Sequence, residues 1–331
     1  MRAIRVPFTG WKPGFSLYRP HAEQPLAPPC AFPHVVDGCS GYRDGVQPSS
    51  VSDAVRDARA RLSAVGIEGP DAELLAAWAS GSSFGELRVE MAMGRAFEAD
   101  ALARFARAVA RRESREPLQH ITGTAPFRHV DLRVGPGVFT PRPETELLVD
   151  VALRHLRRAE SALVLDVGTG SGAVAIAIAR ESGARVVAVE RSPAAYVWAR
   201  RNFDELAPEA TLLHADARDL QALASAGVSP GSLAAFVSNP PYVPDASVPL
   251  DHEVRHFDPH AALYSGADGL DLIRSLAPLA ADLLAPGGLV AFEHAEHQGE
   301  AIREMLADAG FTRAHTHADL AGRDRVTAAI R

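Results

Sequence analysis

The sequence predicts an α/β protein whose main domain is a doubly wound parallel sheet, preceded by a small helical domain and a β-hairpin. Apolar residues follow a helical period over residues 51–116, alternate with polar residues from residue 130, and form short unbroken runs between helical segments after residue 160. The predicted organisation is an extension at 1–50, a helical domain at 51–125, a hairpin linker at 126–145 and an α/β domain at 146–331.

Length and composition exclude several classes of protein. The chain has 331 residues, of which 47% are hydrophobic and 23% charged, so wholesale disorder is excluded and a substantial core can form. A formal net charge of −7 disfavours non-specific binding to nucleic acid. The two cysteines, Cys30 and Cys39, disfavour a disulfide framework or a cysteine zinc site. Neither a membrane-spanning run nor a secretory signal is evident, which predicts a soluble cytoplasmic protein.

Residues 1–50 are rich in proline and show no apolar periodicity. Such a segment cannot offset its ordering entropy by burial, so a disordered or loosely docked extension is expected. A helix can begin directly at Val51, which raises the hypothesis that translation starts there rather than at Met1.

Helical segments are predicted within residues 51–116. Val55, Ala58 and Leu62 recur at helical spacing in the first, and Asp71 can cap the second, DAELLAAWA. The third, FEADALARFARAVARR, has one apolar side and an opposite side that carries Arg104, Arg107, Arg111 and Arg112. This arginine-rich side is expected to be solvated, with contact to an anionic partner as the alternative.

The pattern then changes to that of a strand. Val130, Leu132 and Val134 alternate with polar residues, and Gly135-Pro136-Gly137 follows, so a β-hairpin is predicted with its turn at the glycines. The next segment, TPRPETELLVDVALRHL, starts a helix, because its prolines and acidic residues lie in the first turn, where the helix dipole favours negative charge.

Strands and helices alternate after residue 160. The predicted strands are ALVLDV, RVVAVE, TLLHAD, LAAFVS and GLVAFEH, followed by two further strand-like runs at the end of the chain. The predicted helices are SGAVAIAIAR, AAYVWARRNFDEL, a segment around 270–285, and EAIREMLADAG. Apolar runs without polar alternation are typical of strands that are covered on both faces of a parallel sheet.

A glycine-rich loop, DVGTGSG at residues 166–172, lies between a predicted strand and a predicted helix. Glycines let the backbone turn tightly and approach a ligand, and Glu190 at the end of the next strand can accept both hydroxyl protons of a ribose. The pattern also fits a dinucleotide fingerprint, or a loop that merely closes a turn. Asp166 before the first glycine, and the absence of another substrate domain behind the loop, favour S-adenosylmethionine.

A second signal, Ser238-Asn239-Pro240-Pro241-Tyr242, follows the predicted strand LAAFVS. Ligands of doubly wound sheets bind beyond the carboxyl ends of the strands, so this run and the glycine loop should face one crevice. An ordinary turn is the alternative. The paired prolines, however, lock φ and remove two N–H donors. The Asn239 side-chain oxygen and the Pro240 carbonyl could then each accept one hydrogen from a substrate –NH2 group.

These acceptors suit methyl transfer to a poor nucleophile. The lone pair of an amide or aromatic-amine nitrogen is delocalised, so two acceptors on its hydrogens return density to nitrogen and orient it toward a sulfonium methyl group. The predicted contribution is stabilisation and positioning rather than prior removal of a proton. Tyr242 can pack against the planar group and the cationic methyl donor.

One motif competes with this interpretation. The sequence from His252 to His256 matches the H-E-x-x-H pattern of zinc proteases. Pro249 and Pro259 leave room for only about two helical turns, and no third ligand is obvious downstream, so no metal site is predicted.

Together these stretches resemble the peptide chain release factor glutamine methyltransferases, the PrmC/HemK family, over residues 51–331. The resemblance rests on REPLQHITG at 115–123, GPGVFTPRPETELLV at 135–149, DVGTGSG, SNPPYVP at 238–244 and DLAGRDRV at 319–326. It implies a Rossmann-like class I methyltransferase domain that uses S-adenosylmethionine. It also implies methylation of the side-chain amide of the glutamine in the Gly-Gly-Gln loop of class-1 release factors, with the helical domain helping to grip the protein substrate.

The resemblance further implies roles for individual residues. The implied cofactor contacts are Gly168, Thr169, Gly170, Ser171, Gly172, Glu190, Asp216, Ala217 and Asn239. The implied substrate contacts are Asn239, Pro240, Pro241 and Tyr242, of which Asn239, Pro240 and Tyr242 are the predicted catalytic residues. Three positions depart from the family pattern: Glu190 replaces a common aspartate, Ala217 replaces an aromatic residue of some relatives, and His120 replaces a common tyrosine.

Two other functions stay open at this point. An Asn-Pro-Pro-Tyr run suits any –NH2 group on a planar π system, so an adenine-N6 methyltransferase acting on DNA or RNA is one alternative. The acidic net charge and the absence of a recognition domain after the catalytic one disfavour it. A binding protein with an inactive methyltransferase fold is the other, and the intact Asn239 disfavours that one. Neither direct contact with nucleic acid nor membrane association is expected.

Overall fold

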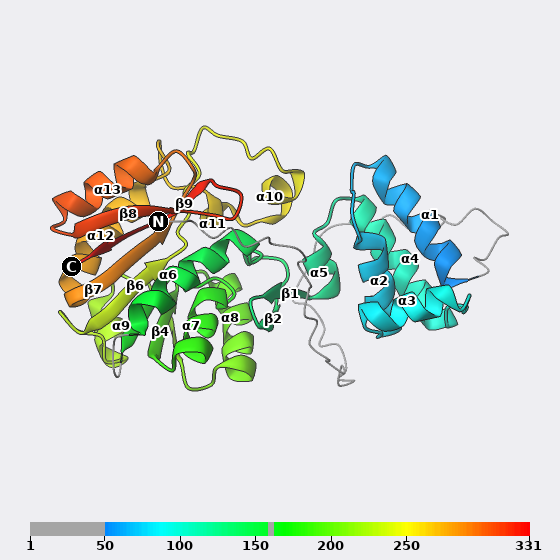
Figure 1. Ribbon diagram of the computed structural model, residues 1–331, viewed down its shortest axis with the longest axis horizontal. Helices are drawn as coiled ribbons and strands as arrows, with labels where there is room; N and C mark the ends of the chain where they lie inside the picture. The colour runs from blue at the N-terminus through cyan, green and yellow to red at the C-terminus, as the bar shows by residue number, and fades with distance from the viewer. Residues whose placement is uncertain (1–49, 158–161) are drawn as a thin grey trace, which may run out of the picture. The chain divides into compact units, whose positions relative to one another are not determined.

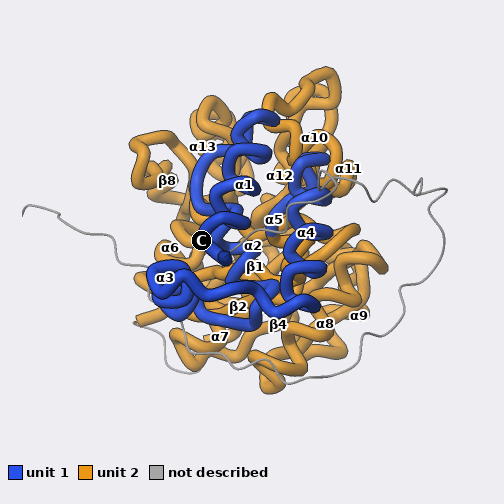
Figure 2. The backbone as a smooth tube through the Cα atoms, turned by 90° about the vertical axis from the view of Figure 1, so that its right-hand side faces the viewer, with its two compact units in different colours: residues 1–118 blue, residues 119–331 orange. Residues whose placement is uncertain are grey.

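The computed structural model describes residues 50–157 and 162–331 (Figure 1). The expected extension at 1–50 lies outside the described residues apart from Ser50, as do both cysteines. The chain divides into two compact units, the first ending at Leu118 and the second running from Gln119 to Arg331 (Figure 2). The expected boundary at residue 125 and the hairpin at 126–145 therefore both fall within the second unit.

The first unit is a helical bundle. Its helices are α1 (Val51–Ala64), α2 (Asp71–Ser80), α3 (Phe84–Ala92) and α4 (Ala99–Glu113). The hydroxyl oxygen of Ser50 caps α1 by accepting the N–H of Asp53 at 3.1 Å. Leu62, Leu75 and Phe105 are among its fully buried side chains. The sequence pattern does not predict α3, because this helix buries a single side chain and lacks an apolar stripe.

The arginine-rich side of α4 is exposed at three of its four arginines, as expected, and the expectation is wrong at the fourth. Arg107 and Arg111 are exposed, whereas Arg112 is buried and its Nε donates to Asp71 Oδ2 at 2.7 Å. Asp71 is the first residue of α2, and the residue before it, Pro70, occupies the N-cap position. Arg104 donates to a main-chain carbonyl of α2. This side of α4 therefore stabilises the helical unit internally.

The β-hairpin lies earlier in the chain than the sequence predicts. Strands β1 (Thr124–Phe127) and β2 (Val130–Arg133) pair antiparallel, with Phe127 opposite Val130. A turn does form at Gly135-Pro136-Gly137, but the prediction that it is the hairpin turn is wrong. Both glycines are also required by packing. A Cβ at Gly135 would lie 2.5 Å from the ring of Trp198, and one at Gly137 would lie 2.9 Å from Ala194.

A seven-stranded mixed sheet organises the second unit. Its strand order is β5-β4-β3-β6-β7-β9-β8, in which β9 and β8 are antiparallel to their neighbours and the rest are parallel. The strands are β3 (Leu163–Val167), β4 (Arg185–Glu190), β5 (Thr211–His214), β6 (Leu233–Ser238), β7 (Leu284–Glu293), β8 (Thr312–Ala318) and β9 (Asp324–Ile330). The predicted doubly wound fold is therefore confirmed.

Helices cover both faces of this sheet (Figure 1). The longer helices are α6 (Glu146–Leu156), α7 (Ala173–Ser182), α8 (Pro193–Leu206), α12 (Asp271–Leu283) and α13 (Gly299–Asp308). The shorter ones are α5 (Leu118–Thr122), α9 (Leu220–Ser225), α10 (His252–Phe257), α11 (His260–Leu263) and a 3-10 turn, η1 (Pro143–Thr145). No helix in the described part of the chain is both long and apolar enough to cross a membrane.

Successive strand residues supply two separate cores. Val164 of β3 packs in the cluster that contains side chains of α6, α7 and α8, whereas its neighbour Leu165 packs with those of α9, α12 and α13. Every residue of β3 is buried. Burial on both faces explains why these strands show unbroken apolar runs in the sequence. It also leaves the carboxyl ends of the strands as the place where polar groups can gather.

Candidate functional site

A cavity of about 400 Å³ opens at the carboxyl ends of the parallel strands. It is lined by segments that follow β3, β4, β5 and β6, and by the segment before α6. The predicted site residues that line it are Gly168, Thr169, Gly170, Ser171, Glu190, Asp216, Ala217, Asn239, Pro240, Pro241 and Tyr242. The prediction that the glycine loop and the Asn-Pro-Pro-Tyr run face one crevice therefore holds.

Gly172 is the predicted contact that does not line the cavity. Gly168 and Gly170 have φ values of 70° and 59°, and nothing lies within 4 Å of a Cβ built on either, so both can face a ligand. Gly172 has a φ of 91° and is the N-cap of α7. A Cβ there would lie 2.7 Å from the ring of Phe203, so this glycine serves close packing beneath the loop.

The loop is connected to the hairpin through a buried asparagine. Asn202 of α8 is fully buried, and its Nδ2 donates to the Ser171 carbonyl at 2.8 Å and to the Arg133 carbonyl at 3.0 Å. Its Oδ1 accepts the Arg133 N–H at 2.7 Å. The hairpin is thus part of the structure that supports the glycine loop.

Asp166 lies beneath the loop with its carboxylate fully enclosed. It accepts the Thr169 hydroxyl at 2.6 Å and the backbone N–H of Ala175 near the start of α7. Burial is the largest influence and raises the pKa of Asp166 to about 7, and the charge of Glu190 acts in the same direction. The two hydrogen bonds oppose this shift.

Glu190 is buried at the end of β4, where both of its oxygens accept backbone hydrogen bonds. Oε2 accepts the Gly170 N–H at 2.9 Å, and Oε1 accepts the Ser192 N–H at 2.7 Å. Each carboxylate oxygen can accept a further hydrogen bond. The side chain is therefore held in a fixed position from which it can still receive ribose hydroxyl groups.

Asp216, which follows β5, is held by a neighbouring arginine. Arg218 donates to it through Nε at 2.8 Å and Nη2 at 2.6 Å. These bonds lower the pKa of Asp216 to about 2, so it is ionised at neutral pH. Ala217 is buried in the adjacent wall. Its side chain is a methyl group, so this position offers no aromatic ring to a ligand.

The cavity fits S-adenosylmethionine better than a dinucleotide. A pyrophosphate needs free backbone N–H groups near a helix N-terminus. The N–H of Gly170 is instead bonded to Glu190, and that of Ala175 to Asp166. Together with Asp216, these carboxylates supply hydrogen-bond acceptors, and Arg191 and Arg218 line the same cavity. Ammonium and hydroxyl donors can bind these acceptors, whereas a pyrophosphate would meet backbone N–H groups that are already occupied.

The Asn-Pro-Pro-Tyr run begins where β6 ends. The Ser238 hydroxyl is buried and donates to the Val167 carbonyl at 2.6 Å, which fixes the end of β6 against the end of β3. Asn239 Nδ2 donates to the Thr145 hydroxyl oxygen at 3.2 Å. With its nitrogen occupied in this way, the Asn239 amide has its oxygen left to accept a hydrogen bond.

Tyr242 is fixed through its backbone. Its carbonyl accepts Gln298 Nε2 at 3.0 Å, and the same nitrogen donates to the Asp268 carbonyl at 3.0 Å. A Cβ at Gly269 would lie 2.1 Å from the Tyr242 carbonyl oxygen, so only glycine fits there. Burial, reinforced by the charge of Glu293, raises the pKa of the Tyr242 phenol, which therefore stays neutral.

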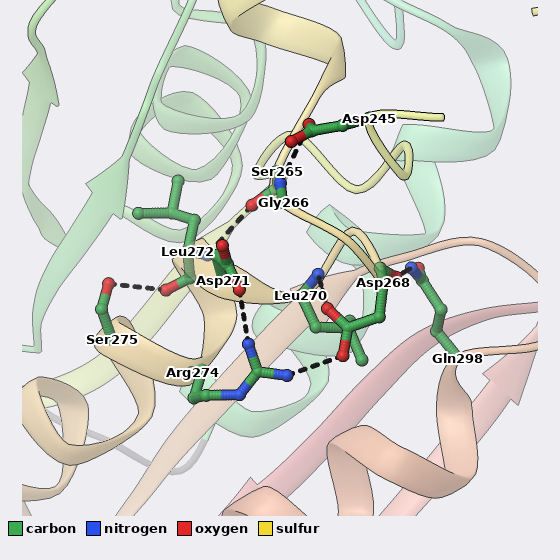
Figure 3. Close-up of polar contacts among 10 residues, drawn as sticks. All are labelled: Asp245, Ser265, Gly266, Asp268, Leu270, Asp271, Leu272, Arg274, Ser275 and Gln298. Carbon is green, nitrogen blue, oxygen red and sulfur yellow. Dashed lines mark hydrogen bonds and ion pairs between the residues drawn. The ribbon is translucent and has the colours of Figure 1, made fainter. Parts of the chain in front are cut away.

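The turn before α12 provides this support (Figure 3). The Arg274 guanidinium donates through Nη2 to Asp268 at 2.7 Å and through Nη1 to Asp271 at 2.6 Å. Gln298 reaches the same turn from the α13 side. The Leu272 N–H is accepted by the Ser265 hydroxyl oxygen at 3.0 Å. This network holds the cavity wall on which the Tyr242 backbone rests.

Two buried polar residues at the site were not anticipated from the sequence. Thr145, in the Pro-Arg-Pro-Glu-Thr segment, lines the cavity and accepts Asn239. Glu293 ends β7, one residue beyond Phe292, which pairs with Ser238. It therefore lies beside Asn239 at the sheet edge. Burial raises the pKa of Glu293 to about 7. Its position at the end of the strand next to β6 is the signal that could have revealed it.

The same Pro-Arg-Pro segment is anchored on its other side. Arg142 Nη2 donates at 2.8 Å to Asp258, whose side chain is buried. Burial raises the pKa of Asp258, and Arg142 opposes that shift. Nearby, His120 is buried with its Nε2 3.4 Å from the Thr140 hydroxyl, so the histidine that departs from the family pattern supports this segment rather than the cavity itself.

The competing H-E-x-x-H match forms the short helix α10. The rings of His252 and His256 lie 4.3 Å apart between centroids. Within residues 50–157 and 162–331, no group of three or more His, Cys, Asp or Glu side chains is arranged to hold a metal ion. The structure therefore offers no third ligand for this motif among the described residues.

Both parts of the chain are similar to known proteins. A family model described as the PrmC N-terminal domain matches residues 53–123, and one described as a methyltransferase domain matches residues 164–238. The release factor glutamine methyltransferase of Corynebacterium glutamicum is 44% identical over 285 residues, which cover 85% of this chain and 98% of that protein. The enzyme of the same name from Streptomyces coelicolor is 43% identical over 282 residues, covering 83% and 96%. That from Bifidobacterium longum is 39% identical over 291 residues, covering 85% and 99%.

Proposed function

The chain belongs to the release factor glutamine methyltransferases, and from this premise we propose that it methylates the side-chain amide nitrogen of the glutamine in the Gly-Gly-Gln loop of class-1 peptide chain release factors. The observation that carries this proposal is that Asn239, Pro240, Pro241 and Tyr242 line the same cavity as the glycine loop. An enzyme with this substrate works in the cytoplasm, where release factors meet the ribosome.

The cofactor, S-adenosylmethionine, supplies an electrophilic methyl group on a sulfonium when it is bound. Gly168 and Gly170 provide a wall without side chains, and Glu190 receives the ribose hydroxyls. Asp216 and Ala217 border the adenine side, where the ionised Asp216 carboxylate offers hydrogen-bond acceptors. Thr169 and Ser171 complete the loop, with Thr169 holding Asp166 in place.

The chain acts on the glutamine by accepting both of its amide hydrogens. The Asn239 side-chain oxygen receives one hydrogen and the Pro240 carbonyl receives the other, so the nitrogen lone pair is oriented toward the methyl group. Pro240 and Pro241 have no N–H to compete for these acceptors, and their φ angles are locked. Tyr242 packs as a neutral ring against the planar amide, because burial keeps its phenol protonated. The proton leaves after transfer, when the nitrogen has become acidic.

The helical domain at 51–125 is proposed to help to grip the protein substrate, and the α/β domain at 146–331 to carry the chemistry. The match of residues 53–123 to the PrmC N-terminal domain supports the first assignment. The cavity supports the second, since most of its lining residues lie between Asp166 and Leu276, and the rest belong to the preceding segment from Gly137 to Thr145.

The experiment is a methylation assay with labelled cofactor, offered in separate reactions to a class-1 release factor, to DNA and to RNA. Label is expected in the release factor only, and peptide mass mapping should place one methyl group on the glutamine of the Gly-Gly-Gln loop. Label that enters only nucleic acid would favour an adenine-N6 methyltransferase. Cofactor binding without transfer to any acceptor would favour a non-catalytic binding protein.

A further inference from the structure

A buried carboxylate beside the proposed acceptor residue has no role in the chemistry described so far. Glu293 is 1% exposed, and its Oε2 is enclosed without a hydrogen-bond partner. Leaving such an atom unpaired in the interior is costly, so its retention next to a reactive site calls for a functional reason.

The surroundings of Glu293 connect it to Asn239 in two ways. Both Thr145 and Asn239 lie within hydrogen-bonding reach of its carboxylate, and Asn239 Nδ2 also donates to Thr145 Oγ1 at 3.2 Å. Thr145 has one hydroxyl proton, which is free to point at Glu293 because its oxygen accepts Asn239. With the Thr145 proton directed at Glu293, the hydrogen bonds would run in one direction, from Asn239 through Thr145 to Glu293.

We propose, on the basis of the function proposed above, that Glu293 is a positioning residue that sets the direction of the Asn239 side-chain amide, so that the amide oxygen faces the substrate. An ionised carboxylate can only accept hydrogen bonds. It therefore attracts the –NH2 end of Asn239 and the hydroxyl proton of Thr145, and it excludes the flipped amide, whose oxygen would face a negative charge. A flipped Asn239 would present donors to the glutamine –NH2 group and could not activate it.

The charge of Glu293 is under the influence of several neighbours. Burial is the largest influence and raises the pKa of Glu293 to about 7, and Glu144 acts in the same direction. Arg325 on β9 opposes this, as do the hydrogen bonds from Thr145 and Asn239. The carboxylate is ionised above that pKa, so positioning should be complete at higher pH. It should weaken as the pH falls through about 7.

The test compares Glu293→Gln with the native protein, using release factor and saturating S-adenosylmethionine. Glutamine has the same shape but can present either a donor or an acceptor, so kcat should fall about 10- to 100-fold, as expected for a misdirected catalytic group. The dissociation constant of the cofactor should change by less than about twofold. Glu296→Gln makes the same chemical change at an exposed position three residues later and serves as the matched control.

The pH profile separates positioning from a structural role. The native kcat should rise with pH through about 7, whereas the kcat of Glu293→Gln should stay low and flat over the same range. Saturating cofactor is needed because Asp166, on the cofactor side, also has a pKa near 7. A Glu293→Gln variant that keeps the native kcat, or the native pH profile, would overturn the proposal.

A second variant keeps the proposal testable if Glu293→Gln folds poorly. Thr145→Val removes the hydroxyl between the two residues with little change of shape, and should lower kcat in the same way. The double variant should lose no more than the larger single loss, because both changes break one chain of hydrogen bonds. Additive losses would contradict the proposal. If the native protein methylates no release factor at all, the proposed function fails instead, which is a distinct outcome.

Discussion

The cofactor end and the substrate end of the cavity are built in different ways, although both rest on buried carboxylates at the ends of strands. Glu190, at the end of β4, has both oxygens bonded to backbone N–H groups of nearby loops. Glu293, at the end of β7, instead faces the side chains of Thr145 and Asn239 and keeps one oxygen without a partner.

This difference separates binding from activation. A carboxylate that accepts backbone N–H groups is fixed once the surrounding loops have folded. The cofactor end can therefore form before any ligand binds. The substrate end depends on the direction of the Asn239 side-chain amide, which is set by side chains from two other segments, Thr145 and Glu293. Changes at the first end should act on cofactor affinity, and changes at the second on the rate of transfer.

The largest effect is expected for Asn239→Ala, which removes a proposed acceptor of the glutamine hydrogens. Transition-state stabilisation should fall by about 2–4 kcal/mol, as for the loss of one group that stabilises developing charge. Cofactor affinity should fall much less. Single-turnover transfer rates and calorimetric titration of S-adenosylmethionine measure the two quantities. An unchanged transfer rate would show that the acceptor argument is wrong.

Glu190→Gln should have the opposite pattern, with a larger effect on cofactor affinity than on the rate of transfer. The amide keeps the shape but cannot accept both backbone N–H groups and both ribose hydroxyls, so cofactor binding should weaken by about 1.5–3 kcal/mol. The value of kcat at saturating cofactor should change less. Glu209→Gln, on the exposed loop after α8, is the control. A variant with native cofactor affinity and reduced kcat would reverse the assignment of the two ends.

Gln298→Glu tests the support of Tyr242 rather than the site itself. The Gln298 amide donates to the carbonyls of Tyr242 and Asp268, and a carboxylate of the same size would face both oxygens with no proton to offer. The free energy of unfolding should fall by about 1–3 kcal/mol, together with kcat. Urea denaturation measures the stability, with Gln221→Glu on the surface of α9 as control. Native stability in the variant would mean that the two hydrogen bonds from the Gln298 amide are not needed to hold this segment.

The smallest effect, taken per pH unit, is the change of stability with pH at the cofactor end. The pKa of Asp166 is about 7 in the folded chain, against 3.8 as the ordinary value. The folded state therefore binds a proton more tightly than the unfolded state does between these values. Its contribution to stability is present at low pH and is lost as the pH rises toward 7, by about 1 kcal/mol per pH unit between roughly pH 5 and 6.

Asp166→Asn should flatten this part of the curve, because the amide does not titrate. Urea denaturation at several pH values compares the variant with the native chain. Glu293 contributes a slope of the same sign, so some dependence should persist in the variant. If Asp166→Asn showed the same pH dependence of stability as the native chain across this range, the assigned direction of the Asp166 shift would be contradicted.

The sequence predicts the cofactor end better than the substrate end, for a physical reason. The loop from Gly168 to Ser171 and the carboxylate of Glu190 belong to local patterns, a glycine turn after a buried strand and an acidic residue at the end of the next. Thr145 and Glu293 become neighbours of Asn239 only when β7 pairs with β6 and the Pro-Arg-Pro-Glu-Thr segment lies across their ends. No local pattern records that arrangement.

The errors in the fold have a similar origin. Gly135 and Gly137 suggest a hairpin turn by composition, yet they are required by the distant Trp198 and Ala194. The sequence predicts that Arg112 lies on a solvated face, whereas in the fold it pairs with Asp71 of another helix. Gly172 completes the glycine motif but faces Phe203 rather than the cavity. Each residue has a local interpretation that tertiary packing replaces.

The most direct test of the account is a crystal structure of the chain with S-adenosylmethionine, or a non-reactive analogue, and a release factor domain that contains the Gly-Gly-Gln loop. The glutamine nitrogen should lie within about 2.7–3.2 Å of both the Asn239 side-chain oxygen and the Pro240 carbonyl oxygen. The Asn239 nitrogen should remain on Thr145. A glutamine bound elsewhere, or one that faces the Asn239 nitrogen, would contradict the claim that these two oxygens activate the amide.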